Sequence, residues 1–258
     1  MLTLSSGSLY KYGLARIFAI AKEFDFEAIE LVINPDCYDT YHEDYLRELI
    51  NSTGIPIVGI ATPVVTSKAK TIRNALTLAE NLNIPNLIVR PPFFTDFRFT
   101  SWFKNKLPQL QDKTHVNICV VNVPASKTFI LPKFAMGNIN ELKRYNHICM
   151  DTSHLVTRKI DLMRAYQNFK SRLSFIQLSN WHKGLEHWMP NEGILPLESF
   201  LTKLAKDGYQ GPIAIKLKLE NIGEDDLSQV KRRLKTCKDF YDEYYVKALA
   251  TKPVKKSN

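Results

Sequence analysis

The sequence predicts an α/β protein folded as one (β/α)8 barrel of the TIM type. Eight short apolar runs alternate with segments of helical apolar spacing over 258 residues, which is the usual size of such a barrel. The apolar runs are hydrophobic throughout, as expected when both faces of a parallel sheet are buried. No shift in composition divides the chain. We therefore expect a single barrel domain over residues 1–250, followed by a basic tail over 251–258.

Each strand is predicted from an apolar run, and each helix from the apolar stripe that follows it. The expected strands cover residues 2–5, 28–32, 57–60, 87–90, 116–121, 147–150, 173–178 and 213–217. The expected helices lie near residues 14–21, 41–52, 72–82, 97–103, 162–169, 197–206 and 230–244, the sixth of them stopped by Asp207-Gly208. Irregular loops are expected over 126–136 and 179–196. Because the strands of such a barrel all end at one mouth, residues that follow the strands should build any site.

Composition and charge restrict the function only broadly. The chain has 35 basic and 26 acidic residues and a net charge of +9, which suits phosphate-bearing ligands or weak attraction to nucleic acid. Solubility is the simpler explanation, because no dense Lys/Arg stripe occurs. No apolar run reaches about 18 residues, and no signal peptide is recognisable. The four cysteines are far apart in the sequence, so we expect free thiols in a cytoplasmic protein without membrane spans.

The segment His147–His154 is the strongest candidate for a site. Its apolar run ends in Asp151, and His154 follows three residues later in what is expected to be a loop. A strand that ends this way brings a carboxylate and an imidazole to the same rim, and both groups are metal-ligand types.

Several segments in consistent order resemble one known family. Residues 24–31 resemble its G-F-D-x-I-E-L second strand, and 149–154 resemble its D-T-x-H segment. Residues 75–82, 186–193 and 207–213 are similar to its third helix, its R-H-x-x-x-G-x-G loop and its x-G-Y-x-G-x-I turn. The chain thus resembles the xylose isomerase-like TIM barrel superfamily. This superfamily includes sugar phosphate isomerases and epimerases, and endonuclease IV-like AP endonucleases (family 2).

The resemblance implies a divalent metal held by Glu, Asp, His and Glu from the fifth to the eighth strands. Only the Asp is kept at its position, as Asp151. The other positions hold different residue types: Val121 beside Asn122 on strand five, Gln177 and then Asn180 on strand seven, Lys216 on strand eight, and Arg90 where the endonuclease branch has a His.

These differences change the charge of the mouth. Val121 and Lys216 remove two negative charges and add a positive one, and an ammonium repels a cation. We therefore expect no cofactor at the family's metal position, with Lys216 in the ion's place and paired with Asp151. In a dry pocket Lys216 could also act as a base or as a Schiff-base nucleophile.

A small sugar or sugar phosphate is the expected partner. Arg90 adds a second positive charge that would help Lys216 to bind a phosphate or a carboxylate. Trp181 and Trp188 could stack on a sugar ring or close the mouth. Lys216 and Asp151 are the catalytic candidates, and the ligand-binding candidates are Glu30, Arg90, Asn122, His154, Gln177, Asn180, Trp181, His187 and Trp188.

Three alternatives stay open at this point. Asp151, His154 and His187 could retain zinc, manganese or magnesium in a working isomerase, with Glu220 brought to the mouth by a shifted last strand. An AP endonuclease would need several metal ions and many more ligands, so nucleic acid is an unlikely partner. A non-catalytic scaffold could use the aromatic stretch Phe93–Phe103 as an interface. The sequence decides neither the substrate nor the oligomeric state.

Overall fold

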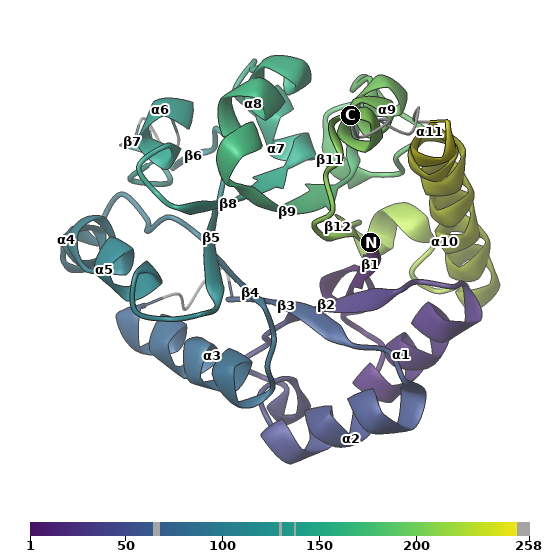
Figure 1. The fold of residues 1–258 in the computed structure, drawn as a ribbon, viewed down its shortest axis with the longest axis horizontal. Coiled ribbons are helices and arrows are strands. Elements are labelled where there is room, and N and C mark those ends of the chain that lie inside the picture. Colours follow the sequence, from purple (N-terminus) through teal and green to yellow (C-terminus); the bar gives the residue numbers. More distant parts are fainter. Residues whose placement is uncertain (64–67, 129–130, 137, 252–258) are drawn as a thin grey trace, which may run out of the picture.

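The computed structural model describes residues 1–63, 68–128, 131–136 and 138–251. Its centre is a closed barrel of parallel strands in the order β1-β12-β9-β8-β5-β4-β3-β2 (Figure 1). The prediction of a (β/α)8 barrel is therefore confirmed. The barrel strands are β1 (Leu2–Ser5), β2 (Ala28–Val32), β3 (Ile57–Ala61), β4 (Asn86–Val89), β5 (Asn117–Val121), β8 (His147–Asp151), β9 (Leu173–Leu178) and β12 (Ile213–Ile215).

Helices surround the barrel on all sides. They are α1 (Leu14–Glu23), α2 (Glu43–Thr53), α3 (Ala69–Asn81), α4 (Phe97–Asn105), α5 (Leu107–Gln111), α6 (Ile139–Leu142), α7 (Thr152–Thr157), α8 (Leu162–Phe169), α9 (Leu197–Asp207), α10 (Leu227–Tyr241) and α11 (Lys247–Ala250). Short 3-10 turns cover Ser6–Leu9, Tyr38–Thr40, Lys170–Arg172 and Leu219–Ile222, and a π-helical turn, Asp242–Val246, joins α10 to α11. The Gly208 stop is confirmed, since Gly208 has φ 77° after α9.

The core has two shells because side chains alternate across each strand. The outer shell lies between barrel and helices and includes Leu2, Leu4, Ile213 and Ile215. The inner shell fills the barrel and is made of Ala28, Val58, Ala61, Ile88, Cys119, Val121, Cys149, Phe175 and Ala214. Towards the ends of the strands the buried residues of the barrel become polar, with Glu30, Asp151 and Gln177. The apolar filling thus forms the floor under a polar mouth.

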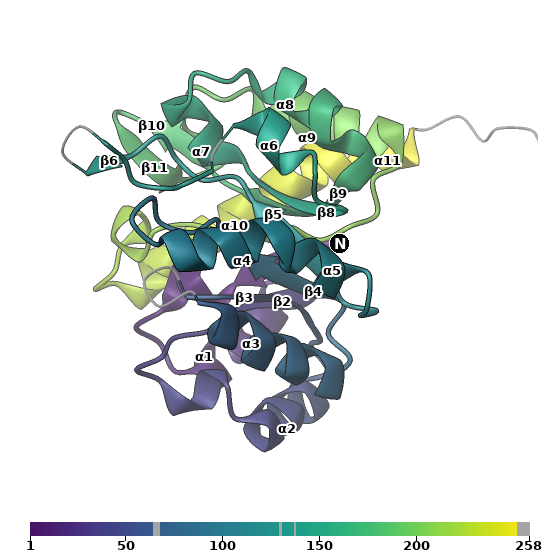
Figure 2. The same cartoon turned by 90° about the vertical axis from the view of Figure 1, so that its left-hand side faces the viewer.

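Several local expectations need correction. The loop expected after Asp151 begins with the short helix α7. The expected irregular loops contain two hairpins, β6 (Lys127–Thr128) with β7 (Leu131–Pro132), and β10 (Asn180–His182) with β11 (Leu185–Trp188). Both hairpins lie at the opposite end of the barrel from the N-terminus (Figure 2). The last barrel strand ends at Ile215, so Lys216 follows it directly. The expected tail falls almost entirely on 252–258, outside the described residues.

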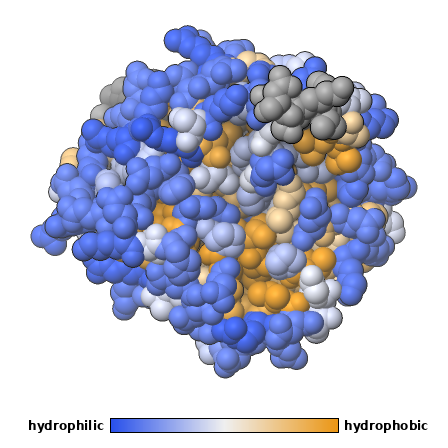
Figure 3. All heavy atoms as spheres, viewed as in Figure 1, coloured by the Kyte–Doolittle hydropathy of each residue, from blue (hydrophilic) through white to orange (hydrophobic). Residues whose placement is uncertain are grey.

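The surface is mostly hydrophilic around its periphery, with apolar residues towards the centre of the face shown in Figure 3. In the aromatic stretch, Phe99 and Phe103 are buried, whereas Phe97 is 72% exposed. Two of the six aromatic side chains of this stretch therefore pack fully inside the fold, and Phe93, Phe94 and Trp102 are partly buried. The four cysteines are free thiols, and three are buried. No described helix has the length and apolar character needed to cross a membrane.

Gly59 on β3 tests how tightly the barrel is filled. A Cβ at this position would lie 2.7 Å from Cε2 of Phe175 and 3.0 Å from Cδ1 of Ile88. Gly59→Ala should therefore lower the free energy of unfolding by about 1–3 kcal/mol through overpacking, as measured by denaturant unfolding. Gly13→Ala is the control, because a Cβ at Gly13 meets nothing within 4 Å. Equal stability of the two variants would contradict the described packing.

Candidate functional site

Asp151 is the centre of the polar mouth. It ends β8 and caps the N-terminus of α7, where its Oδ1 accepts hydrogen bonds from the His154 N–H (3.4 Å) and the Ser153 hydroxyl (2.9 Å). Asn122, which follows β5, fixes the backbone of Asp151: its Nδ2 donates to the Asp151 carbonyl (2.9 Å), and its Oδ1 accepts from the Asp151 N–H (2.7 Å). The carboxylate is fully buried, so it needs partners of opposite charge.

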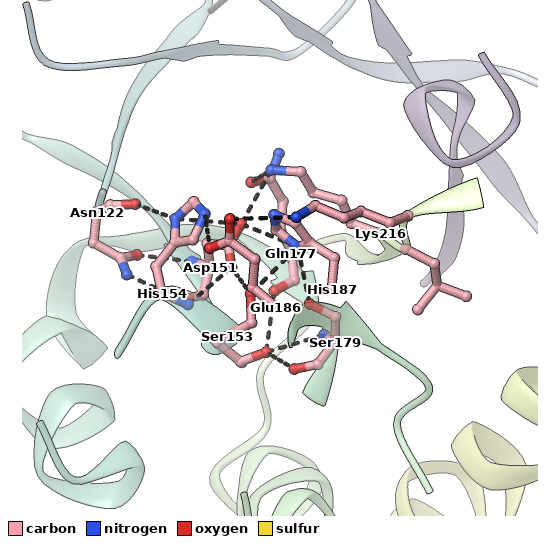
Figure 4. A network of polar contacts seen from close by, with 12 residues as sticks. Asn122, Asp151, Ser153, His154, Gln177, Ser179, Glu186, His187 and Lys216 are labelled. Atoms are coloured by element: carbon pink, nitrogen blue, oxygen red, sulfur yellow. Dashed lines mark hydrogen bonds and ion pairs between the residues drawn. The ribbon is translucent and has the colours of Figure 1, made fainter. Parts of the chain in front are cut away.

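Lys216 supplies that charge. Its Nζ lies 3.0 Å from Oδ2 of Asp151 and donates to Oε1 of Gln177 at 2.7 Å. The amide of Gln177 in turn donates through Nε2 to Oε1 of the buried Glu30. Figure 4 shows Lys216 reaching Asp151 and Gln177 at the centre of this network. Lys216 is thus connected to the carboxylate of Asp151 directly and to that of Glu30 through the amide of Gln177. The pairing of Lys216 with Asp151 was expected from the sequence.

Two histidines approach the same carboxylate oxygen of Asp151 as Lys216 does. Nδ1 of His154 is 2.8 Å from the Asn122 carbonyl oxygen and 3.5 Å from Oδ2 of Asp151. Nδ1 of His187 lies 4.0 Å from the same Oδ2, and 3.3 Å and 3.2 Å from the hydroxyls of Ser153 and Ser179. One ligand atom each of Asp151, His154 and His187 lies within 4.8 Å of the others. This cluster could hold a metal ion, but Lys216 already bonds to Oδ2.

Burial and charge set the protonation of the cluster. Burial opposes ionisation of Asp151, yet His154, which becomes positive in acid, and Lys216 hold the pKa of this carboxyl well below its usual range. Burial lowers the pKa of His154 to about 4, although Asp151 opposes the shift. Burial likewise lowers the pKa of His187 well below its ordinary value. At neutral pH the site therefore has an ionised Asp151 beside two neutral imidazoles.

Arg90 adds positive charge to the mouth. It follows β4 and is partly buried, and its charge helps to lower the pKa of both His154 and His187, where burial is the larger cause. Within the described part of the chain its guanidinium makes no hydrogen bond or ion pair. A bidentate cation without a carboxylate partner is suited to an anionic ligand.

The loop residues behave differently from the barrel residues. Both polar atoms of the Asn180 side-chain amide bind within the loop. Nδ2 donates to the carbonyls of Pro190 and Leu195, and Oδ1 accepts from the N–H groups of Trp181 and Leu195. Trp188 stacks on His182 at 5.2 Å and donates to Glu192. Asn180 and Trp188 therefore shape the hairpin loop, and Trp181 is partly buried in the same hairpin.

The alternative that depended on Glu220 is not supported by its position. Glu220 lies on the surface in the 3-10 turn Leu219–Ile222, and its Oε1 accepts a hydrogen bond from the Tyr10 hydroxyl (3.0 Å). The strand ends before Lys216 and is not shifted, so Glu220 does not replace the missing carboxylate of strand eight.

Three residues of the site were not among the candidates. Ser153 and Ser179 contact Nδ1 of His187, and Glu186 on β11 places Oε2 at 3.8 Å from Nε2 of His154. Ser153 lies inside the D-T-x-H segment and Glu186 precedes the histidine of the loop motif. Their proximity to those motifs was the available signal.

Comparisons with known proteins agree with this architecture. The family model described as "Xylose isomerase-like TIM barrel" matches residues 18–237. An uncharacterized protein of Mycobacterium leprae is 20% identical over 258 aligned positions, covering 85% of this chain and 89% of the relative. An uncharacterized protein of Mycobacterium tuberculosis is also 20% identical, with 83% and 87% covered.

Solved structures show the same fold. A xylose isomerase domain protein from Alicyclobacillus acidocaldarius has a TM-score of 0.72 at 14% identity, covering 97% of this chain and 99% of that chain. A D-tagatose 3-epimerase-like protein has a TM-score of 0.70 at 16% identity, with 96% and 98% covered. An L-ribulose 3-epimerase has a TM-score of 0.70 at 12% identity, with 99% of both chains covered.

The lowered pKa of His154 makes stability depend on pH. Between about pH 6.5 and 4 the unfolded chain binds a proton at this histidine and the folded chain does not. Stability contributed by the neutral ring is therefore present above that window and is lost as the pH falls. We expect a loss of about 2 kcal/mol from His154 between pH 7 and pH 5, measured by denaturant unfolding.

His154→Asn should reduce this loss, because the amide can still donate to the Asn122 carbonyl but does not titrate. His115→Asn is the matched control, since His115 is exposed. A steep loss of stability that persists unchanged in His154→Asn would contradict the assignment.

Proposed function

Because the chain belongs to the xylose isomerase-like TIM barrel family, we propose that its mouth binds a small sugar-like or phosphorylated ligand, with Lys216 in place of the family's metal ion. The protein is then a sugar phosphate isomerase/epimerase-like barrel whose metal site has been altered. The D-tagatose 3-epimerase-like protein and the L-ribulose 3-epimerase, which share the fold, support a sugar as the class of ligand.

One observation carries the proposal, namely the 3.0 Å contact between Nζ of Lys216 and Oδ2 of Asp151. This oxygen is also the carboxylate atom nearest to both imidazoles. A divalent ion bound to Asp151, His154 and His187 would have to share it with an ammonium. The loss of two family carboxylates further weakens the attraction for a cation. Lys216 thus compensates the negative charge of Asp151, which a metal ion would otherwise compensate.

The ammonium keeps binding capacity for a ligand. Lys216 has three N–H donors, and its protein acceptors are Asp151 and Gln177. The remaining donor and the guanidinium of Arg90 can bind an anionic or carbonyl oxygen. In this proposal Lys216 stabilises negative charge on that oxygen during reaction. Asp151 orients the Lys216 side chain through their 3.0 Å contact.

A metal-dependent isomerase is the second candidate. The grouping of Asp151, His154 and His187 supports it, because two imidazoles and a carboxylate form a common zinc-ligand set. An AP endonuclease with several metal ions would need more such groups, and this is the one group of its kind in the described chain.

Metal analysis separates the two candidates. Wild-type protein should retain no stoichiometric zinc, manganese or magnesium, since an ammonium occupies the coordination position of Oδ2. Lys216→Glu should bind Zn²⁺ or Mn²⁺ at least tenfold more tightly, because it adds a carboxylate to Asp151, His154 and His187. Metal content and the metal-induced shift in Tm are the measurements. Stoichiometric metal in wild-type protein would favour the second candidate and sink the first.

Anion binding tests the ligand class. Inorganic phosphate should stabilise wild-type protein beyond chloride of equal ionic strength, by up to about 2.7 kcal/mol at one hundred times Kd. Arg90→Met should weaken phosphate binding at least tenfold, because it removes the one cation of the mouth that lacks a partner among the described residues. Arg98→Met, on the exposed face of α4, is the control. An identical phosphate response in both variants would refute this role of Arg90.

A further inference from the structure

Two hydrogen-bond acceptors face each other at the mouth. Oε2 of Glu186 lies 3.8 Å from Nε2 of His154, too far for a direct hydrogen bond. Oε2 is buried and has no donor in the described part of the chain. Figure 4 shows both side chains directed towards the centre of the network. A buried acceptor left without a donor is costly, so this pair points to a group that the protein itself does not supply.

The tautomer of His154 is set by its other nitrogen. Nδ1 lies 2.8 Å from the Asn122 carbonyl oxygen, and a carbonyl can only accept, so Nδ1 carries the hydrogen. In the tautomer with its hydrogen on Nδ1, the ring presents the lone pair of Nε2 to Glu186. Oε2 of Glu186 therefore requires a donor from outside the described residues, and Nε2 of His154 beside it can accept a second one.

The backbone of β11 aims Glu186 at this gap. Neighbouring residues of a regular strand point to opposite faces, yet Glu186 and His187 both contact residues of α7. His187 has φ 57°, a left-handed conformation that is uncommon outside glycine and breaks the alternation. Oε1 of Glu186 is held 3.6 Å from Nζ of Lys218, which leaves Oε2 for the gap.

We propose that Glu186 and His154 form a diol subsite that binds two adjacent hydroxyl groups of the ligand, one hydroxyl donating to each acceptor. This inference rests on the proposed function, because Lys216 and Arg90 would bind the anionic end of the same molecule. The substrate class is then a polyhydroxylated anion, such as a sugar acid. A metal ion is less suited to the gap, because only two protein ligands face it and zinc sites use three or four.

A matched pair of carboxylates tests the diol subsite. Butyrate can use only the cationic groups, whereas threonate, its trihydroxy derivative, can also use the subsite. By calorimetric titration, wild-type protein should bind threonate at least tenfold more tightly than butyrate. Glu186→Gln should abolish this preference and keep the affinity for butyrate. Its amide can donate to Nε2 of His154 and close the gap, so Tm without ligand should also rise.

Glu192→Gln is the control, because Glu192 is an exposed carboxylate of the same loop whose bond from Trp188 an amide oxygen can still accept. This variant should keep the preference for threonate. A preference that survives in Glu186→Gln, or equal binding of both acids by wild-type protein, would overturn the diol subsite. Stoichiometric Zn²⁺ binding that Glu186→Gln removes would overturn it in favour of a metal. If neither acid nor phosphate binds wild-type protein, the proposed function fails with it.

Discussion

The ion pair between Asp151 and Lys216 is the interaction on which the mouth of the barrel depends. Asp151 has no exposed surface, and a buried carboxylate without a cation would be strongly unfavourable. Its Oδ1 accepts from Ser153 and the start of α7, while Oδ2 faces Lys216. Helix α7 and the end of β12 are therefore tied to one carboxylate. Loss of either partner would leave the other as an uncompensated buried or half-buried charge.

Gln177 extends this pair across the barrel. An amide has both a carbonyl acceptor and an N–H donor, so it can accept from Lys216 and donate to Glu30 at once. The residue types at positions 177 and 216 thus match each other, and both match a mouth built around an ammonium.

The fold could be predicted from the sequence because its signals are local. Apolar runs and helical stripes predicted all eight strands, and Asp207-Gly208 predicted the end of α9. The short elements could not be predicted in this way. Helix α7 has only six residues, too few for a periodic stripe, and hairpin β10–β11 depends on left-handed residues at Lys183, Gly184 and His187. These conformations are set by packing against the rest of the site.

The candidate site was likewise predictable only where residues lie at strand ends, and not where packing sets the backbone conformation. Residues at strand ends, such as Lys216 and Gln177, could be placed because barrel topology brings strand ends together. Glu186 could not be placed from the sequence, because the regular alternation of a strand predicts that it points to the opposite face from His187. Its actual position brings Oε2 of Glu186, an acceptor without a donor among the described residues, to the same mouth as the cations Arg90 and Lys216. A ligand that matches both kinds of group must carry negative charge and also donate hydrogen bonds, as a polyhydroxylated anion does.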